Sequence, residues 1–491
     1  MIDLTGITKK IFLETTVCSR KGWLFRNRKD LVELSTGDRF RMEQGIEIGE
    51  MARELFPGGI LVQERPVERA AKRTAELLAD SSVQVIFEAT FLYRDYTAKA
   101  DVLIRNGDTW DLAEVKSKTT KVLEKKKVRS DLIDDIAYTS LIIAKNGLTI
   151  STARLMLLSE QFRLGMSIDK LFESSDVTGD VNQRVTESEK LLDSCSAVTS
   201  QVMQPEFRLT AQCKKCDFFN HCIPECAEYT ILDIPRISGK QLLELQSKGI
   251  FLIRDIPGTF RLTPTQELPV ECMRSGKPAI NKGLAMELKK VRWPAHYLDF
   301  ETTMTAFPLY PDTAPNESVP TQYSIHTCSE CGTILRHTEY LANPARDCRR
   351  ELAESMIRDL DGNGSVLMYS TYEETIIKGL IKTCPDLSGS LTAILSRLVD
   401  LIECTKCVGH PEFRGSNSIK DVLPVLVRDM SYEGLPIANG DDALVTFASM
   451  ARGKFSPEEC VRKCGEMLRY CELDTLAMVR IHEEFEKMVE I

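Results

Sequence analysis

Two apolar, β-forming runs on either side of a short polar segment predict a β-hairpin. The runs cover residues 100–105 and 110–116, and Asn-Gly-Asp-Thr lies between them. With glycine first of the two central residues, the turn is typical of type II′. In this register Asp101 pairs directly with Glu114, so both side chains lie on one face of the ribbon.

Helical and extended patterns surround this hairpin. Apolar periodicity predicts helices over residues 45–56, 68–79 and 131–144, and strands over 83–92 and 150–158. The order of helix, strands, helix and strand indicates an α/β domain.

The second half of the chain has patterns of its own. A buried strand is predicted over residues 295–302, and a second strand over 366–373 ends in the carboxylate of Glu373 and leads into a helix. Asp400 is predicted to end a helix, and a long amphipathic helix is predicted around 468–475. Between the halves, short helices at 239–249, 253–260 and 282–292 predict a small helical connector.

The composition is that of a globular protein. The 491 residues suffice for two or three domains, and we expect divisions at 1–230, 231–292 and 293–491. No run of eighteen apolar residues is present, and the first residues lack a signal-peptide pattern. A cytoplasmic protein that does not enter a membrane is therefore expected. The net charge of −9 argues against a general polyanion-binding surface, but it allows a local basic groove.

The predicted hairpin gathers three charged side chains. Lys116 shares the face of Asp101 and Glu114, because side chains alternate along a strand. Two carboxylates can hold a hard divalent cation, and the lysine can orient a water or neutralise a phosphate. The alternative is a surface hairpin with a cross-strand salt bridge.

This Asp followed by Glu-x-Lys resembles the core of the PD-(D/E)XK nuclease superfamily, in particular the RecB-like branch that includes the CRISPR-associated exonucleases. The resemblance implies a restriction-endonuclease-like domain over residues 1–230, in which Asp101, Glu114 and Lys116 are catalytic and bind Mg²⁺ or Mn²⁺. Residues 116–129 carry seven basic side chains and one acidic one, so they either contact phosphate or form a solvated loop.

Two features of that family are missing. The first helix lacks the family's histidine, and Glu47 is a possible substitute ligand. The helix after the lysine lacks the family's glutamine, and Tyr138 is interpreted as a remnant of its Gln-x-x-x-Tyr pattern.

Cysteines point to a soft metal centre. The chain has sixteen, and in a cytoplasmic protein metal ligation or buried thiols are expected before disulfides. Thiolates with C-x₂-C-x₅-C spacing can converge on zinc or iron–sulfur, with a fourth ligand from elsewhere. One distant N-terminal cysteine plus this cluster is similar to the iron–sulfur staple of RecB-like nucleases. That resemblance implies a [4Fe–4S] cluster on Cys18, Cys213, Cys216 and Cys222. The alternative is a zinc site that uses Cys226 in place of Cys18.

Acidic residues mark the second half. Asp299 and Glu301 lie two apart on a predicted buried strand, and buried carboxylates need a partner such as a metal ion. Tyr470 and Asp474 are four apart on the predicted helix and share a face.

Asp-x-Glu, a later acid and Tyr-x₃-Asp together resemble the DEDD exonucleases, tyrosine variety, on an RNase H-like fold. The resemblance implies two divalent ions on Asp299, Glu301, Glu373 and Asp474, with Tyr470 positioning the attacking water. The family has aspartate at the second motif, so Glu373 departs from it, and Glu374 is an alternative ligand. The other interpretation is four unrelated acids on a packed α/β core.

Nearly the whole chain is also similar to a bacterial family of uncharacterised proteins that join these two kinds of domain. The segments 297–302 and 415–424 carry this resemblance, and Lys420 in the second either contacts phosphate or belongs to a structural turn. Two further C-x₂-C pairs can bind zinc if they meet in space, the second with His410 nearby. They are Cys328 with Cys331 and Cys404 with Cys407.

Three hypotheses follow. The first is an exonuclease with two nuclease centres, both using Mg²⁺ or Mn²⁺, that degrades DNA from single strands or ends in repair or defence. The second is a single 3′–5′ exonuclease, on DNA or RNA, whose first domain is an iron–sulfur-stabilised nucleic-acid clamp. The third is a non-enzymatic adaptor or redox sensor that carries the cluster.

Overall fold

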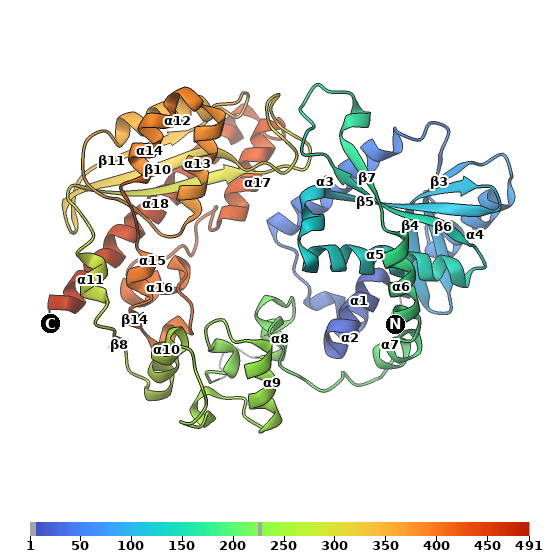
Figure 1. Cartoon of the computed structure of the whole chain (residues 1–491), viewed down its shortest axis with the longest axis horizontal. Coiled ribbons are helices and arrows are strands. Elements are labelled where there is room, and N and C mark those ends of the chain that lie inside the picture. The colour runs from blue at the N-terminus through green and yellow to red at the C-terminus, as the bar shows by residue number, and fades with distance from the viewer. Residues whose placement is uncertain (1–5, 224–227, 491) are drawn as a thin grey trace. The chain divides into compact units, whose positions relative to one another are not determined.

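The computed structural model describes residues 6–223 and 228–490, which divide into two compact units (Figure 1). The first unit contains the described residues up to 208, together with 217–222 and 305–317. The second contains 209–216, the described residues between 223 and 304, and those from 318 onward. Both units mix helices and strands, in agreement with the expected α/β class.

A mixed sheet forms the centre of the first unit. In the described chain its strands are β1 (Ile7–Thr8), β2 (Ile60–Leu61), β3 (Val85–Tyr93), β4 (Tyr96–Asn106), β5 (Thr109–Thr119), β6 (Ile150–Leu158) and β7 (Phe172–Asp176). Their order is β2-β3-β4-β5-β6-β7, with β1 beside β4. The helices are α1 (Lys9–Val17), α2 (Ser19–Asn27), α3 (Thr36–Arg53), α4 (Val67–Ala79), α5 (Lys126–Lys145), α6 (Thr178–Glu189), α7 (Leu192–Thr199) and α8 (Phe219–Cys222).

The hairpin of β4 and β5 has the predicted register. Asn106 pairs with Thr109, and Val102 pairs with Ala113. Gly107 has a φ of +59°, a left-handed conformation that glycine adopts without steric cost. This register puts residues 101 and 114 opposite each other, as the sequence predicts.

Helix α3 begins at residue 36 rather than 45, because a capping box lies upstream of the apolar periodicity. The Asp38 N–H donates to Ser35 Oγ at 3.0 Å, and the Ser35 N–H donates to Asp38 Oδ2 at 3.2 Å. The remnant tyrosine expected on α5 has a structural contact, since Tyr138 Oη lies 2.9 Å from the carbonyl oxygen of Ile7.

The second unit is built on another mixed sheet. Its described strands are β9 (Ala295–Thr303), β10 (Val319–Glu330), β11 (Thr333–Leu341), β12 (Val366–Met368) and β13 (Leu398–Asp400), in the order β11-β10-β9-β12-β13. β9, β10 and β11 are antiparallel neighbours, whereas β12 is parallel to β9 and β13. A separate pair joins β8 (Ala279–Ile280) to β14 (Val408–Gly409). The helices are α9 (Gly239–Ser247), α10 (Pro264–Ser275), α11 (Leu284–Leu288), α12 (Arg349–Asp359), α13 (Tyr372–Thr383), α14 (Ser388–Leu395), α15 (Ile402–Thr405), α16 (Ile419–Leu426), α17 (Gly440–Ala451) and α18 (Pro457–Glu490).

The two faces of this sheet have different chemistry. Leu298 and Phe300 of β9 point into an apolar core that α12, α13 and α14 complete. Alternation turns Asp299 and Glu301 to the opposite face, where α18 lies. A sheet with one apolar and one polar face therefore positions the acids.

Several predicted elements of the second half differ in the structure. Residue 400 ends the strand β13 and not a helix, because pairing with β12 outweighs the local helical pattern. The helix expected at 253–260 is only a short 3₁₀ turn, Ile253–Asp255, and the unpredicted α10 follows it. Glu373 lies in the first turn of α13 rather than at the end of a strand.

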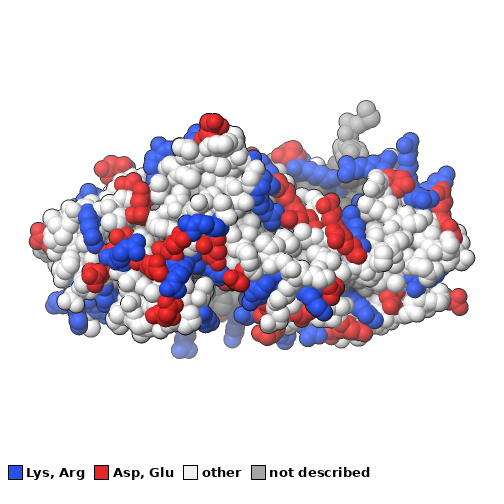
Figure 2. Space-filling view, turned by 90° about the horizontal axis from the view of Figure 1, so that it is seen from above, with Lys and Arg blue, Asp and Glu red and all other residues white. Residues whose placement is uncertain are grey.

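The surface and the helices add two observations. No helix in the described part of the chain has the length and apolar character needed to cross a membrane. On the face drawn in Figure 2, Lys and Arg side chains lie interspersed with Asp and Glu side chains, with larger areas of other residues between them.

Candidate active sites

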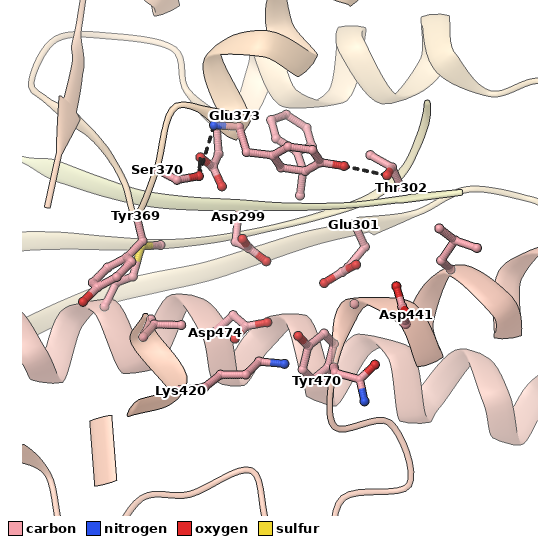
Figure 3. Close-up of a pocket in the computed structure, with 17 residues that line it drawn as sticks. Asp299, Glu301, Thr302, Tyr369, Ser370, Glu373, Lys420, Asp441, Tyr470 and Asp474 are labelled. Atoms are coloured by element: carbon pink, nitrogen blue, oxygen red, sulfur yellow. Dashed lines mark hydrogen bonds between the residues drawn. The ribbon is translucent and has the colours of Figure 1, made fainter. Parts of the chain in front are cut away.

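Four acids and a tyrosine predicted from the sequence line one pocket of the second unit. The pocket has a volume of about 700 Å³, and its lining includes Asp299, Glu301, Glu373, Tyr470 and Asp474. Figure 3 shows Asp299 and Glu301 pointing toward Asp474 and Tyr470. The strand alternation of β9 and the i, i+4 spacing on α18 therefore converge on the same space.

Three of these acids are close enough to share an ion. One carboxylate oxygen from each of Asp299, Glu301 and Asp474 lies within 4.8 Å of the other two. Glu301 and Asp474 are buried, whereas Asp299 is partly exposed to the pocket.

The fourth acid comes from α13. Glu373 is buried, and Ser370 Oγ lies 3.5 Å from its Oε2 (Figure 3). The alternative acid, Glu374, is absent from the described lining of the pocket and pairs with Lys378 at 2.5 Å. The geometry therefore favours Glu373 over Glu374 as the fourth member of the site.

Crowding of these acids changes their proton affinity. Desolvation, with the charge of Asp474 added, raises the pKa of Glu301 to about 8. Desolvation also raises the pKa of Asp474 to about 6 and that of Glu373 to about 7. The pKa of Asp299 is raised well above its usual value by desolvation and by its acidic neighbours. A bound cation would relieve this repulsion.

Two further residues contact the side chains of this site. The predicted motifs did not include Tyr432, and they left the role of Lys420 open. Tyr432 donates a hydrogen bond to Asp474 Oδ1 at 2.5 Å, and it lies in an irregular segment that gave no sequence signal. Lys420 lines the pocket, and its Nζ donates to the carbonyl oxygen of Ala438 at 2.9 Å. The same ammonium lies 5.4 Å from the ring centroids of Tyr432 and Tyr470, so it is held beside the acids.

The hairpin residues line a second pocket, within the first unit. Its volume is about 400 Å³, and it is lined by Asp101, Glu114 and Lys116 of the hairpin. Asp101 Oδ2 accepts a hydrogen bond from the Val115 N–H at 2.8 Å, which holds the carboxylate beside β5.

Two basic side chains of this second pocket, instead of one, contact Glu114. Lys9 Nζ lies 2.5 Å and Lys116 Nζ 3.0 Å from Glu114 Oε1. Lys116 also pairs with Asp135 of α5. Lys9 and Asp135 are part of the site that the sequence motif did not reveal, because they come from separate helices.

The pKa values of the two hairpin acids are shifted in opposite directions. Burial raises the pKa of Glu114, but the ammonium groups of Lys116 and Lys9 outweigh it and hold the pKa near 2. Burial and the charge of Glu114 raise the pKa of Asp101 to about 7. Glu114 Oε2 is buried without a hydrogen-bond partner in the described chain, so it remains open to a cation.

Helix α3 and strand β3 supply the rest of this pocket. Gly45, Ile46 and Gly49 line it, but the expected substitute ligand Glu47 is not among the described lining residues. Glu88 of β3 lines it instead, with a φ of +54° that is unusual for a glutamate inside a strand. No sequence pattern marked Glu88.

The cysteines of the expected cluster belong to both units. Cys18 and Cys222 are in the first unit, and Cys213 and Cys216 are in the second. The Thr210 N–H donates a hydrogen bond to Cys213 Sγ at 3.2 Å. Cys226 of the zinc alternative lies outside the described residues.

Burial favours the protonated thiol form of cysteines in the other C-x₂-C pairs. Burial raises the pKa of Cys328 to about 11 and those of Cys331 and Cys404 to about 12. In the described chain, neither pair belongs to a group of three or more ligand side chains within 4.8 Å. Their zinc site stays a prediction.

Comparison with known proteins adds a family description and a structural likeness. A domain of unknown function (DUF2779) matches residues 296–418, a range that includes Asp299, Glu301 and Glu373. No curated protein matches the chain. The chain is similar to the crystal structure of an alkaline exonuclease (LHK-Exo) from Laribacter hongkongensis, with 15% identity and a TM-score of 0.18. That match covers 40% of this chain and 89% of the other.

Proposed function

We propose that this protein is a divalent-metal-dependent nuclease that hydrolyses phosphodiester bonds of DNA in the pocket of the second unit. The observation that carries the proposal is the convergence of Asp299, Glu301 and Asp474 within 4.8 Å. Their pKa values are raised, so the acids are short of positive charge. Oxygen ligands of this charge favour Mg²⁺ or Mn²⁺.

Glu373 supports a site for two ions, because it adds a buried carboxylate to the three that converge in the same pocket. When bound, two divalent cations stabilise the attacking and leaving oxygens of an in-line displacement. Desolvation keeps the Tyr470 phenol protonated by raising its pKa, so its O–H can donate a hydrogen bond to the attacking water. Lys420 supplies a positive charge to the scissile phosphate from the same side as Tyr470.

A second nuclease centre at the hairpin is supported by the unpartnered Glu114 Oε2 beside Asp101. Against it, Lys9 and Lys116 already neutralise Glu114 Oε1. The alternative function is therefore a single 3′–5′ exonuclease, on DNA or RNA, in which the first unit serves as a nucleic-acid clamp.

The finer architecture belongs to the same proposal. The antiparallel β9–β11 continued by parallel β12 and β13 is compatible with an RNase H-like DEDD domain of the tyrosine variety. The β3–β5 meander flanked by α3 and α5 is compatible with a PD-(D/E)XK domain.

Cleavage of labelled DNA and RNA oligonucleotides with Mn²⁺ tests the function. We expect Asp299→Asn or Asp474→Asn to lower kcat/KM by about 10²–10³-fold, the usual cost of removing one electrostatic catalytic group. Glu374→Gln is the matched control, since this acid pairs with Lys378 and should leave cleavage unchanged. Full activity in both Asp299→Asn and Asp474→Asn would contradict the proposal.

The hairpin variants decide between one centre and two. If both centres cleave, Asp101→Asn and Glu114→Gln each remove part of the activity, and the product pattern changes. If the first unit is a clamp, they leave the rate on saturating substrate unchanged.

The [4Fe–4S] cluster on Cys18, Cys213, Cys216 and Cys222 is proposed from the resemblance of this cysteine pattern to that of RecB-like nucleases. Anaerobically purified protein should have a broad visible absorption that disappears in Cys216→Ser. Stoichiometric zinc in colourless protein would favour the zinc alternative.

A further inference from the structure

A second group of metal-ligand side chains lies on the β10–β11 pair. His326 of β10 is directly opposite His337 of β11, and Glu472 projects from α18. One ligand atom from each of the three lies within 4.8 Å of the others. None of them is among the described residues that line the acidic pocket.

The two imidazoles are held together before any ion arrives. Their rings stack with centroids 4.5 Å apart and planes inclined by 27°. His326 is buried, and His337 Nδ1 lies 3.8 Å from Glu472 Oε1. The group therefore combines strand register with a helix that crosses the same face of the sheet.

One proton arrangement of the hydrogen bonds around the two rings leaves a lone pair on each imidazole. Thr475 Oγ1 lies 3.1 Å from the carbonyl oxygen of Glu472, and its single proton is donated to the helix backbone. His326 Nδ1 and Ser324 Oγ each lie 2.8 Å from Thr475 Oγ1, and in this arrangement both donate to it. Ser324 has then used its proton, and it accepts from His337 Nε2 at 2.8 Å.

This assignment leaves His326 Nε2 and His337 Nδ1 without protons. Both atoms then offer lone pairs, and His337 Nδ1 faces a carboxylate oxygen that also offers only lone pairs. Lone pairs that face one another are satisfied by a cation between them.

We propose that His326, His337 and Glu472 form a Zn²⁺ site, separate from the site for Mg²⁺ or Mn²⁺. Two imidazoles and one carboxylate form a zinc ligand set that leaves the fourth position to water. Hydrogen bonds from the outer ring nitrogens to Thr475 and Ser324 orient the ligands, as is usual for histidines that bind metal. Mg²⁺ prefers oxygen ligands and should not fill this site.

The ion would fasten the edge strand β11 to α18. Glu472 lies between Tyr470 and Asp474 on that helix, so the same helical turn carries the zinc ligand and two residues of the acidic pocket. Zinc binding at this site does not require nuclease activity, and the two proposals can fail separately.

Zinc binding to the chelator-treated full chain tests the site, with millimolar Mg²⁺ present to occupy the acidic pocket. Glu472→Gln keeps the size of a half-exposed side chain and removes its charge. We expect Glu472→Gln and His337→Gln each to lower the affinity for one equivalent of Zn²⁺ by about 10–100-fold or more. Glu484→Gln, an acid of the same helix that pairs with Lys487, should bind as the wild type does.

Cobalt distinguishes this site from the cysteines. The Co²⁺ absorption that Glu472→Gln removes should lack a sulfur-to-cobalt charge-transfer band. Equal binding in wild type, Glu472→Gln and His337→Gln, or a removed band with sulfur character, would overturn the assignment.

Hydrogen exchange measures whether bound Zn²⁺ stabilises β11 against α18. Amides of residues 333–341 should exchange more slowly with Zn²⁺ in the wild type and show no such change in Glu472→Gln. Unchanged exchange in the wild type would refute the link between β11 and α18.

Discussion

Lys9 Nζ lies 2.5 Å from Glu114 Oε1, although the two residues are 105 positions apart in the chain. In the first unit a protein cation therefore already satisfies one oxygen of the hairpin acid. In the second unit Asp299, Glu301 and Asp474 face one another, and their pKa values rise instead of falling. The two pockets thus differ in how strongly they need an external cation.

Removing the charge of Lys9 should destabilise the first unit. In Lys9→Met, Glu114 keeps only Lys116, so its pKa rises from about 2 toward the usual 4.5. We expect a loss of about 1–3 kcal/mol in the free energy of unfolding at pH 7. Because the pKa of Glu114 is lower in the folded state than in the unfolded state, its charge stabilises the folded protein above about pH 4.5. This contribution is lost as the pH falls toward 2.

Urea denaturation at pH 7 and pH 3.5 measures this effect. The difference between wild type and Lys9→Met should shrink at the lower pH. Lys10→Met is the control, since its ammonium lies over the Phe25 ring and its effect should not depend on pH in this range. An equal difference at both pH values would contradict the role of Glu114.

Without a divalent cation, the acidic pocket should cost stability at high pH. An acid whose pKa is raised in the folded state contributes its full stability to the fold below its unfolded-state pKa. That contribution is lost as the pH rises through the folded-state pKa. Because the folded-state pKa of Glu301 is about 8, this loss of stability occurs between about pH 4 and pH 8. In chelator at pH 8, Asp299→Asn should be about 1–3 kcal/mol more stable than wild type, because one repelling charge is removed.

Thermal unfolding in chelator at pH 5 and pH 8 checks this prediction. The advantage of Asp299→Asn should fall at pH 5 and should disappear when Mn²⁺ stabilises the wild type. Glu374→Gln should show no such dependence. A variant less stable than wild type at pH 8 would mean that the carboxylate already has a partner.

Tyr432 should set the acidic limb of the pH–rate profile. Desolvation raises the pKa of Asp474 to about 6, and the hydrogen bond from Tyr432 limits that rise. Tyr432→Phe should therefore raise this pKa by up to about one unit, because a bond to the charged form is lost. The acidic limb of kcat/KM against pH should move to higher pH by the same amount.

Tyr369→Phe is the matched control for this prediction. Tyr369 also lines the pocket, but its hydroxyl bonds to Thr405 at 2.9 Å rather than to an acid. An equal shift in both variants would indicate a general change of the pocket.

The charge of Lys420 should act on substrate binding. Lys420→Met should raise KM for an oligonucleotide by about 10–100-fold and lower the slope of log KM against log salt by about one. Lys420→Arg keeps the charge and should restore most of the salt dependence. If Met and Arg cause the same loss at every salt concentration, the residue acts through packing and not through charge.

The local elements follow closely from the chain's own pattern. The hairpin register, the strand at residues 150–158 and the helix that carries Tyr470 and Asp474 were all predicted. These predictions succeed because a two-residue turn and a strand or helical period are short-range properties. Residue 400 was assigned to a helix and lies in β13, because its pairing with β12 is a contact distant in sequence.

The sequence by itself determined which acids share a face, since the spacing of two on a strand and four on a helix needs no tertiary information. Only the tertiary structure decided what meets those faces. Lys9 beside Glu114, Tyr432 beside Asp474 and His326 beside His337 are neighbours brought together by packing of separate elements. The physical reason is that burial and charge partners depend on distances across the fold, and these set the pKa of each acid and its need for a cation.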